Sequence, residues 1–265
     1  TSTSSAETPV APRTPEQQRS TEKSRPSVFW VLAIVVVPIA GLLAEVRIRD
    51  SHKLPQTGAY VLAPNHHSEI DPITVAVAVW RMKRAPRFMA KESLFRVPVL
   101  GAALRATGMV PVQRGMSARA AKATVDAATD LVRHERGVIV YPEGTLTRDP
   151  GLWPMRGKTG AVRLALAAGI PLIPLAHWGE QQILPRYGKL RLWPPRRRVD
   201  VIVGDPIDLS DLAGREHEQA ALVEGTRRLM DAIAALLGEL RGETPPAERW
   251  NPAAHKQNET GRYEP

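Results

Sequence analysis

The sequence predicts an α/β fold, in which a mainly parallel sheet is flanked by helices within a single domain. Two observations lead to this prediction: short apolar strands alternate with amphipathic helices between residues 60 and 241, and two of the strands end in polar, turn-forming loops. Strands separated by helices favour parallel pairing, with helices on both faces of the sheet. A chain of 265 residues with 43% hydrophobic content can also supply a full core.

The individual elements follow from local patterns. An apolar run at residues 60–63 predicts a buried strand that Pro64 ends, and Pro72 is favoured in the first turn of a helix at 72–82. Apolar residues at helical spacing between positions 222 and 240 predict a closing C-terminal helix whose stripe is core. We expect the other helices at 118–133 and 158–168, and the other strands at 138–141, 172–175 and 199–203.

The two ends of the chain differ from the middle in composition. Residues 1–25 and 242–265 are rich in polar and charged residues and carry few large apolar side chains. Such segments bury too little apolar surface to offset the entropy lost on ordering, so we expect two disordered tails. Between them the sequence predicts a membrane-associated helix at 26–48 and a globular domain at 49–241.

The apolar segment at 28–44 contains no charged residue and is marginally short of a comfortable bilayer span. A long polar stretch precedes it, which argues against a secretory signal peptide. Basic residues lie on both sides, Lys23 and Arg25 before it and Arg47 and Arg49 after it, so no positive-inside bias orients a spanning helix. A helix embedded in one leaflet and a true span both remain open.

Charge and composition limit the classes of partner. Lysines and arginines number 36 against 27 acidic residues, which gives a net charge of +9 and favours an anionic partner such as a phospholipid surface or a nucleic acid. Aromatic residues make up only 5% of the chain, so it offers little for stacking on single-stranded bases. With no cysteine, disulfides, thiolate catalysis and cysteine-ligated zinc are excluded.

The polar loop at 65–71 follows the first predicted strand and reads Asn-His-His-Ser-Glu-Ile-Asp. Pro72 disfavours helical geometry at Asp71, so the loop can double back and let Asp71 accept the Nδ1 proton of His66. That contact would fix the tautomer and leave Nε2 free to take a proton from a hydroxyl. The alternative is that Asp71 is a helix N-cap and the histidines are ordinary loop residues.

A second strand end favours the catalytic interpretation. The strand at 138–141 runs into Pro-Glu-Gly-Thr, a turn-forming sequence with a carboxylate at Glu143. In open α/β sheets, ligands bind outside the carboxyl ends of the strands. Two strand ends that both carry chemical groups therefore indicate one site.

Five segments then occur in a fixed order within residues 50–210. They are Asn-His-x-Ser-x-x-Asp at 65–71, Lys-Glu-Ser-Leu-Phe at 91–95, Gly-Met-Val-Pro-Val-Gln-Arg at 108–114, Pro-Glu-Gly-Thr at 142–145 and Ile-Pro-Leu-Ile-Pro-Leu at 170–175. In this order they resemble the motifs of the glycerolipid acyltransferases, the family typified by 1-acylglycerol-3-phosphate acyltransferase. Each segment alone is weak evidence, whereas the ordered set is strong.

The sequence departs from the family pattern in two places. The second motif usually has an aromatic and an acidic residue before its arginine, but here the residues are Pro-Val-Gln-Arg and end at Arg114. The third motif often ends in Arg-Ser, whereas here Leu-Thr-Arg follows. Arg148 either replaces the usual arginine from a shifted position or is simply solvated.

The resemblance implies transfer of a fatty acyl group from an acyl thioester to the free hydroxyl of a lysophospholipid, with 1-acylglycerol-3-phosphate as the first choice and phosphatidic acid as the product. The implied donor is acyl-coenzyme A or an acyl carrier protein, and we expect no metal and no other cofactor. We expect the domain at 49–241 to act at a membrane, with its active site on the cytoplasmic face. The implied site residues are catalytic His66 and Asp71 and substrate-binding Lys91, Arg114, Glu143, Gly144 and Thr145.

Rival interpretations remain open. Within the same chemistry, another lysolipid or a glycolipid is the alternative acceptor. A non-catalytic basic protein that binds a membrane or a nucleic acid would use His66 and Asp71 structurally, and a hydrolase would use the same base on water. The chain lacks the Gly-x-Ser-x-Gly elbow of hydrolases. We expect His177 to be a packed or capping residue, and the arginine run at 196–198 beside Trp193 to be a solvated loop in preference to a lipid anchor.

Overall fold

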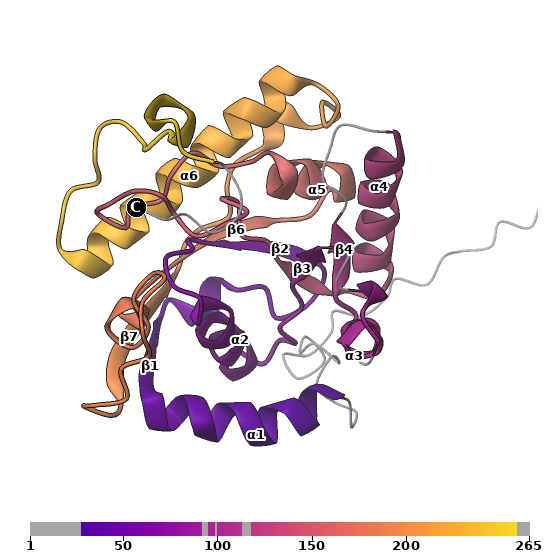
Figure 1. Cartoon of the computed structure of the whole chain (residues 1–265). Coiled ribbons are helices and arrows are strands. Elements are labelled where there is room, and N and C mark those ends of the chain that lie inside the picture. Colours follow the sequence, from indigo (N-terminus) through magenta and orange to yellow (C-terminus); the bar gives the residue numbers. More distant parts are fainter. Residues whose placement is uncertain (1–27, 92–94, 99, 113–117, 259–265) are drawn as a thin grey trace, which may run out of the picture.

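The computed structural model describes residues 28–91, 95–98, 100–112 and 118–258. Its main sheet has five strands in the order β1-β7-β6-β2-β5, and it curls between two layers of helices (Figure 1). Neighbouring strands are parallel except β6 and β7, which are antiparallel. The strands are β1 (Ala44–Arg49), β2 (Tyr60–Pro64), β5 (Gly137–Ile139), β6 (Leu172–Trp178) and β7 (Arg197–Val203).

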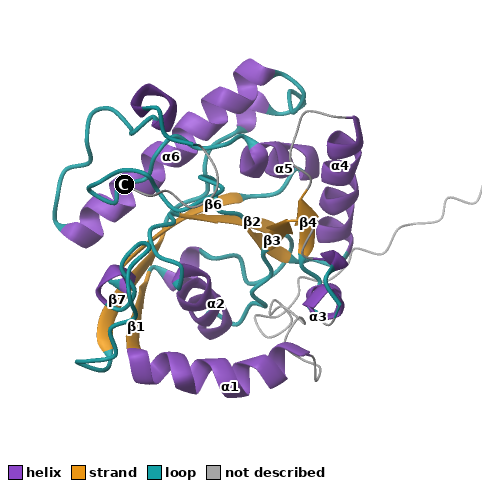
Figure 2. Cartoon of the chain, in the orientation of Figure 1, coloured by secondary structure: helices purple, strands orange, loops and turns teal. Residues whose placement is uncertain are grey.

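The helices surround this sheet, and a small second sheet lies at one end (Figure 2). The helices are α1 (Val28–Leu43), α2 (Asp71–Arg81), α3 (Leu100–Ala106), α4 (Ala118–Arg133), α5 (Gly160–Ala168) and α6 (Gln219–Arg241). The second sheet pairs β3 (Met89–Lys91) with β4 (Val110–Val112) in parallel. Short 3-10 turns lie at Ser51–Lys53, Glu180–Gln182, Ser210–Leu212 and Pro252–His255.

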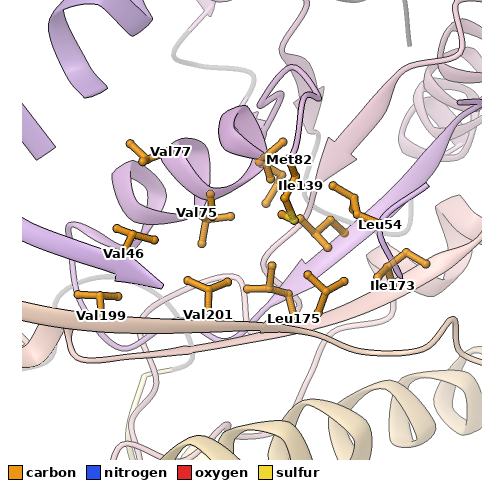
Figure 3. Packing of buried hydrophobic residues seen from close by; sticks show 14 of the residues in the cluster. Val46, Leu54, Val75, Val77, Met82, Ile139, Ile173, Leu175, Val199 and Val201 are labelled. Atoms are coloured by element: carbon orange, nitrogen blue, oxygen red, sulfur yellow. The ribbon is translucent and has the colours of Figure 1, made fainter. Parts of the chain in front are cut away.

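Helices cover both faces of the sheet. Successive side chains of β2 point to opposite faces, so they enter two different cores. Leu62 belongs to the core beneath α1 and α2, whereas Val61 and Ala63 belong to the core beneath α5 and α6. Figure 3 shows the first core, where Val75 of α2 faces Val201 of β7 across the layer. Full burial on both faces explains the uninterrupted apolar run that predicts β2.

The predicted α/β domain with its sheet flanked by helices is confirmed, and the predicted strands and helices are present with small shifts at their ends. One correction concerns the segment at 26–48, which was expected to be helical throughout. The helix α1 ends at Leu43, because the next six residues pair with β7 as strand β1. Ala44 and Val46 are buried on one face of β1. This two-residue alternation is typical of a strand and not of a helix.

Helix α1 packs on α2 through one side and exposes the other. Phe29 and Ala40 are buried, and the ring of Trp30 lies edge-on to Trp80 with centroids 5.3 Å apart. On its outward side α1 exposes four large apolar residues, Ile34, Val35, Ile39 and Leu42. Among the described residues, no helix has both the length and the apolar character needed to cross a bilayer.

The residues after α6 also differ from expectation. The segment at 242–258 was predicted to be disordered, but its backbone and side chains contact the domain. The Trp250 carbonyl accepts a hydrogen bond of 3.1 Å from the Arg156 backbone N–H, and Arg249 forms an ion pair with Asp231 of α6. These specific contacts offset the ordering cost that composition alone predicts. The expected tail at 1–25, and residues 259–265, lie outside the described residues, and the remaining domain boundaries stay predictions.

Candidate functional site

The loop between β2 and α2 brings His66 and Asp71 together. The Nδ1 atom of His66 lies 3.1 Å from Oδ2 of Asp71, which also accepts hydrogen bonds of 2.6 Å from the His67 N–H and 2.8 Å from the Ser68 N–H. The Asp71 side chain is fully buried, whereas that of His66 is 16% exposed. Because a carboxylate only accepts hydrogen bonds, this contact places the proton of His66 on Nδ1 and leaves Nε2 as an acceptor.

Asp71 contacts the ring of His66 more closely than that of His67, as the loop geometry predicts, and the catalytic role of His66 stays a prediction. His67 lies four residues before Asp71, as in a helical pair, yet its Nδ1 is 4.0 Å from the carboxylate oxygen. The loop instead turns so that His66 makes the shorter contact. A backbone hydrogen bond of 2.7 Å from the Thr147 N–H to the His66 carbonyl holds this turn against the loop that follows β5.

Tyr141, just beyond β5, supports the other side of the histidine. Its ring is stacked on that of His66, with centroids 4.2 Å apart and planes inclined by 28°. The Tyr141 hydroxyl is buried and has no hydrogen-bond partner in the described part of the chain. Burial first, and then the charges of Asp71 and Glu180, raise the pKa of Tyr141 well above its usual value. The ring therefore orients His66 by packing, a role that no local pattern in the sequence indicates.

Glu143 holds the His66 loop through hydrogen bonds to backbone N–H groups. Its carboxylate is fully buried and accepts hydrogen bonds of 3.0 Å from the His66 N–H and 3.0 Å from the Met155 N–H, one at each oxygen. Burial raises the pKa of the Glu143 carboxyl to about 8, against the opposing effect of these two N–H groups. Glu143 thus positions the histidine, and the substrate-binding role expected for it stays a prediction.

The other predicted binding residues are placed to different degrees. Gly144 has a φ of +69°, which glycine adopts without strain, and a Cβ atom there would lie 3.3 Å from Cδ of Lys158. Thr145 is half-buried in the same turn. Lys91 ends β3, where its backbone is paired with Val112. Arg114 lies outside the described residues, so its predicted contact with an acceptor phosphate stays a prediction.

Arg148, considered above as a substitute for the family's usual arginine, is not solvated. It is 1% exposed, and its Nη1 donates a hydrogen bond of 2.7 Å to the Tyr187 hydroxyl. The side chain therefore supports the protein interior in this structure.

A buried network lies behind the loop that carries His66 and Asp71, where β2 and β6 are neighbours. The Asn65 side chain accepts a hydrogen bond of 2.9 Å from the His177 N–H and donates one of 3.1 Å to the His177 carbonyl. The His177 ring in turn donates from Nε2 to the Asn65 carbonyl at 2.8 Å, and its Nδ1 lies 2.9 Å from Glu180. Asn65, just past the end of β2 and directly before His66, is therefore held in place by His177 of β6.

This network contains an ion pair between the His177 imidazolium and the Glu180 carboxylate. Burial lowers the pKa of His177, but the negative charges of Glu180 and Asp71 outweigh it and raise that pKa to about 9. Burial likewise opposes ionisation of Glu180, yet the contacts with His177 and His67 hold its pKa well below the usual range. His177 is thus a packed histidine, as expected, with an additional role as a buried cation.

The same residues form a group with metal-ligand chemistry. His67, Asp71, His177 and Glu180 are all buried, and one candidate ligand atom from each lies within 4.8 Å of the others. Both ring nitrogens of His67 already have hydrogen-bond partners. His67 Nδ1 lies 3.0 Å from the Asn65 amide, and Nε2 lies 3.2 Å from Gln181 Oε1. Hydrogen bonds account for these nitrogens, and the absence of a metal stays a prediction.

A cavity of about 780 Å³ opens beside the Glu143 turn, between the segment at 155–159, α6 and the C-terminal segment. Glu143 forms part of its wall, which links the cavity to the loop that holds His66. Basic side chains and apolar ones both line it: Arg156, Lys158, Arg227 and Arg249 on one hand, and Met155, Val223 and Met230 on the other. Such a lining suits a ligand that combines anionic and apolar parts.

Comparison with known proteins gives consistent matches. The family model described as Acyltransferase matches residues 45–178, just over half of the chain. A 1-acyl-sn-glycerol-3-phosphate acyltransferase of Haemophilus influenzae is 29% identical over 65% of this chain and 67% of its own length. One from Bacillus subtilis is 26% identical over 76% of this chain and 94% of its own length. A chloroplastic one from Brassica napus is 31% identical, but the match covers only 34% of that protein.

A solved structure supports the fold independently. The crystal structure of the 1-acyl-sn-glycerophosphate acyltransferase PlsC from Thermotoga maritima superimposes with a TM-score of 0.59, covering 84% of this chain and 81% of the other at 21% identity. At that identity the likeness concerns the fold alone.

Proposed function

The chain belongs to the Acyltransferase family, and from this premise we propose that it transfers a fatty acyl group from an acyl thioester to the free hydroxyl of 1-acylglycerol-3-phosphate, which gives phosphatidic acid. The printed names of the relatives from Haemophilus and Bacillus support this acceptor. Another lysolipid or a glycolipid would use the same chemistry and is the alternative. The donor is acyl-coenzyme A or an acyl carrier protein, and no other cofactor is proposed.

The observation that carries the proposal is the 3.1 Å contact between His66 Nδ1 and Asp71 Oδ2. With Nδ1 protonated, Nε2 removes the proton of the acceptor hydroxyl while the oxygen attacks the thioester carbonyl carbon. The tetrahedral intermediate then collapses, the carbon–sulfur bond breaks, and the proton passes from Nε2 to the leaving thiolate. Asp71 stabilises the imidazolium between these two steps. No acyl-enzyme is required.

The acceptor phosphate needs a cationic partner. We assign Arg114 and Lys91 to it, because charge-assisted hydrogen bonds from guanidinium and ammonium groups bind phosphate strongly. Glu143, Gly144 and Thr145 then shape the acceptor site from the turn after β5. The adjoining cavity, with Arg156 and Lys158 in its lining, supports a ligand with both phosphate and acyl parts.

The enzyme is proposed to work at a membrane surface, with its active site on the cytoplasmic face. Lysophospholipids partition into bilayers, so an enzyme that acylates them gains by attachment to the bilayer. The outward side of α1 supports this placement, since it exposes Ile34, Val35, Ile39 and Leu42.

Incubating the purified full chain with labelled acyl-coenzyme A, or with labelled acyl carrier protein, and a panel of lysolipids tests the proposal. We expect labelled phosphatidic acid from 1-acylglycerol-3-phosphate, and at least a hundredfold less product from a folded His66→Ala variant. Label found only in another lipid identifies the alternative acceptor. Release of free fatty acid without any acylated lipid would instead identify a hydrolase and overturn the proposal.

A further inference from the structure

The loop that leads into β7 carries an unusual concentration of exposed apolar side chains. Trp193 is 82% exposed, and Leu192 and Leu190 are 58% and 51% exposed. Single exposed apolar residues are common on protein surfaces, but a cluster that includes an almost free indole marks a surface that meets an apolar partner. We call residues 189–197 the Trp193 loop.

This loop has a defined shape. The Arg191 N–H donates a hydrogen bond of 2.7 Å to the Ile183 carbonyl, which joins the loop to the segment after β6. The Arg197 side chain donates to the Pro194 carbonyl at 3.3 Å and to the Trp193 carbonyl. The indole is therefore presented to solvent by backbone that is held in place, so its exposure is a property of the fold.

The Trp193 loop lies against the end of α1. The Arg196 N–H donates a hydrogen bond of 3.1 Å to the Leu42 carbonyl, and Leu42 itself is 67% exposed. In Figure 1, α1 runs along the lower edge of the molecule and the loop projects at lower left beside its C-terminal end. The exposed side of α1 and the Trp193 loop thus meet at Leu42.

Positive charge accompanies these apolar groups. Lys189, Arg191 and Arg196 are exposed, and among the described residues none of them forms an ion pair. Arg198, by contrast, is already paired with Asp200 at 2.6 Å. Indoles favour the headgroup level of a bilayer, and basic side chains beside them favour anionic headgroups. A surface that joins both matches a lipid bilayer better than it matches a nucleic acid, for which one exposed aromatic ring offers little stacking.

We propose that the Trp193 loop and the exposed side of α1 form one surface that binds an anionic lipid bilayer. Trp193 and Leu192 enter the headgroup region beside the apolar face of α1, while Arg191 and Arg196 contact the lipid phosphates. This inference reverses the sequence-based preference for a solvated loop. It adds a second attachment to the one proposed for α1, and it does not depend on the proposed reaction.

Sedimentation of the full chain with vesicles tests the surface without any acyl donor. The vesicles are phosphatidylcholine alone or phosphatidylcholine mixed with phosphatidylglycerol. Trp193→Ser should lower binding to both kinds by on the order of tenfold. Arg191→Gln should lower binding to the anionic vesicles alone, by about fivefold. The matched controls lie on α4, remote from the loop: Val132→Ser, at a position 48% exposed, and Arg133→Gln, which is also exposed.

Two further measurements keep the outcome clear. All four substitutions are at exposed positions, so thermal unfolding should be unchanged, and acyl transfer to an acceptor in detergent micelles should match that of the unaltered chain. If Trp193→Ser binds vesicles as well as Val132→Ser does, the loop does not contact the bilayer and the inference is overturned. Equal loss for Arg191→Gln and Arg133→Gln would refute the specific role of the loop charges. Failure of the proposed reaction would show instead in the micelle assay of the unaltered chain.

Discussion

The ring of Tyr141 is stacked on the ring of His66, with centroids 4.2 Å apart, and this contact joins the loops that follow β2 and β5. The two strands are parallel neighbours, with Leu62 opposite Ile139, so their carboxyl ends meet at one edge of the sheet. The imidazole is consequently held on its edge by Asp71 and on its face by Tyr141.

Removing the base should sharply lower the rate of acyl transfer without unfolding the protein. General-base catalysis contributes roughly a hundred- to ten-thousandfold, so we expect His66→Ala to lower turnover within that range. Asp71→Asn should also lose most activity, because the amide can present its NH₂ group to Nδ1 and favour the wrong tautomer. Turnover is measured with labelled acyl-coenzyme A, and circular dichroism checks the fold. Turnover comparable to that of the unaltered chain in a folded His66→Ala protein would contradict the mechanism.

The stacked tyrosine allows packing and hydrogen bonding to be separated. Tyr141→Phe keeps the ring and removes a hydroxyl that has no partner in the described residues, so activity and stability should be unchanged or slightly higher. Tyr141→Ala removes the ring, which should cost about 3 kcal/mol of stability and free the His66 ring to rotate. Kinetics and denaturant unfolding of both variants provide the measurement. A large loss of activity in Tyr141→Phe would mean that the hydroxyl takes part in the reaction.

The sequence contains enough local information to predict half of this site. The pairing of His66 with Asp71 depends on a short loop that is visible in consecutive residues. The expected effect of Pro72 is not seen, because α2 already begins at Asp71. Strand β2 was equally predictable, because burial on both faces leaves an uninterrupted apolar run. The geometry at these positions is determined by neighbours in the chain.

The other half depends on contacts between distant segments. Nothing near Tyr141 in the sequence indicates that its ring meets His66, and the exchange of hydrogen bonds between Asn65 and His177 requires knowing that β2 and β6 are neighbours. Strand β1 was hidden because its apolar alternation directly continues the apolar helix before it. Glu180 was not predicted to belong to the site, although it follows the end of a predicted strand three residues after His177.

Arg114 provides the sharpest test of the acceptor assignment. A guanidinium–phosphate contact contributes roughly 1.5 to 3 kcal/mol, so Arg114→Ala should weaken use of a phosphorylated acceptor by about ten- to hundredfold and affect the donor much less. The Michaelis constants for acceptor and donor are measured separately, with a non-phosphorylated monoacylglycerol as the comparison acceptor. If the acceptor Michaelis constant and turnover stay unchanged, Arg114 does not bind the phosphate.

Glu143 should give the stability of the fold a dependence on pH. Its pKa is raised by burial to about 8, so between roughly pH 4.5 and 8 the folded protein keeps a proton that the unfolded chain releases. Stability from this group therefore falls as pH rises through that window. Glu143→Gln removes the titration but leaves one backbone N–H without an acceptor, at a cost of about 1 to 3 kcal/mol. Urea unfolding from pH 5 to 9 should show the deficit of the variant shrinking as pH rises; a constant deficit would contradict the raised pKa.

The buried pair of His177 and Glu180 should show a different profile. The pKa of His177 is raised to about 9 by Glu180 and Asp71 against the effect of burial, whereas that of Glu180 is held below its usual range. The histidine contribution is therefore complete below about pH 6.5 and is lost as pH rises through 9, while the glutamate contribution is present above about pH 4.5. Glu180→Gln leaves a buried imidazolium without its carboxylate and should cost about 3 kcal/mol near pH 6, with the loss shrinking above pH 9. Glu45→Gln, which breaks the exposed pair with Arg47, is the control and should change little.

Because Asn65 is held by His177, we also expect Glu180→Gln to lower turnover with little change in the acceptor Michaelis constant. A Glu180→Gln protein as stable as the control at pH 6 would show that the pair does not support the catalytic loop.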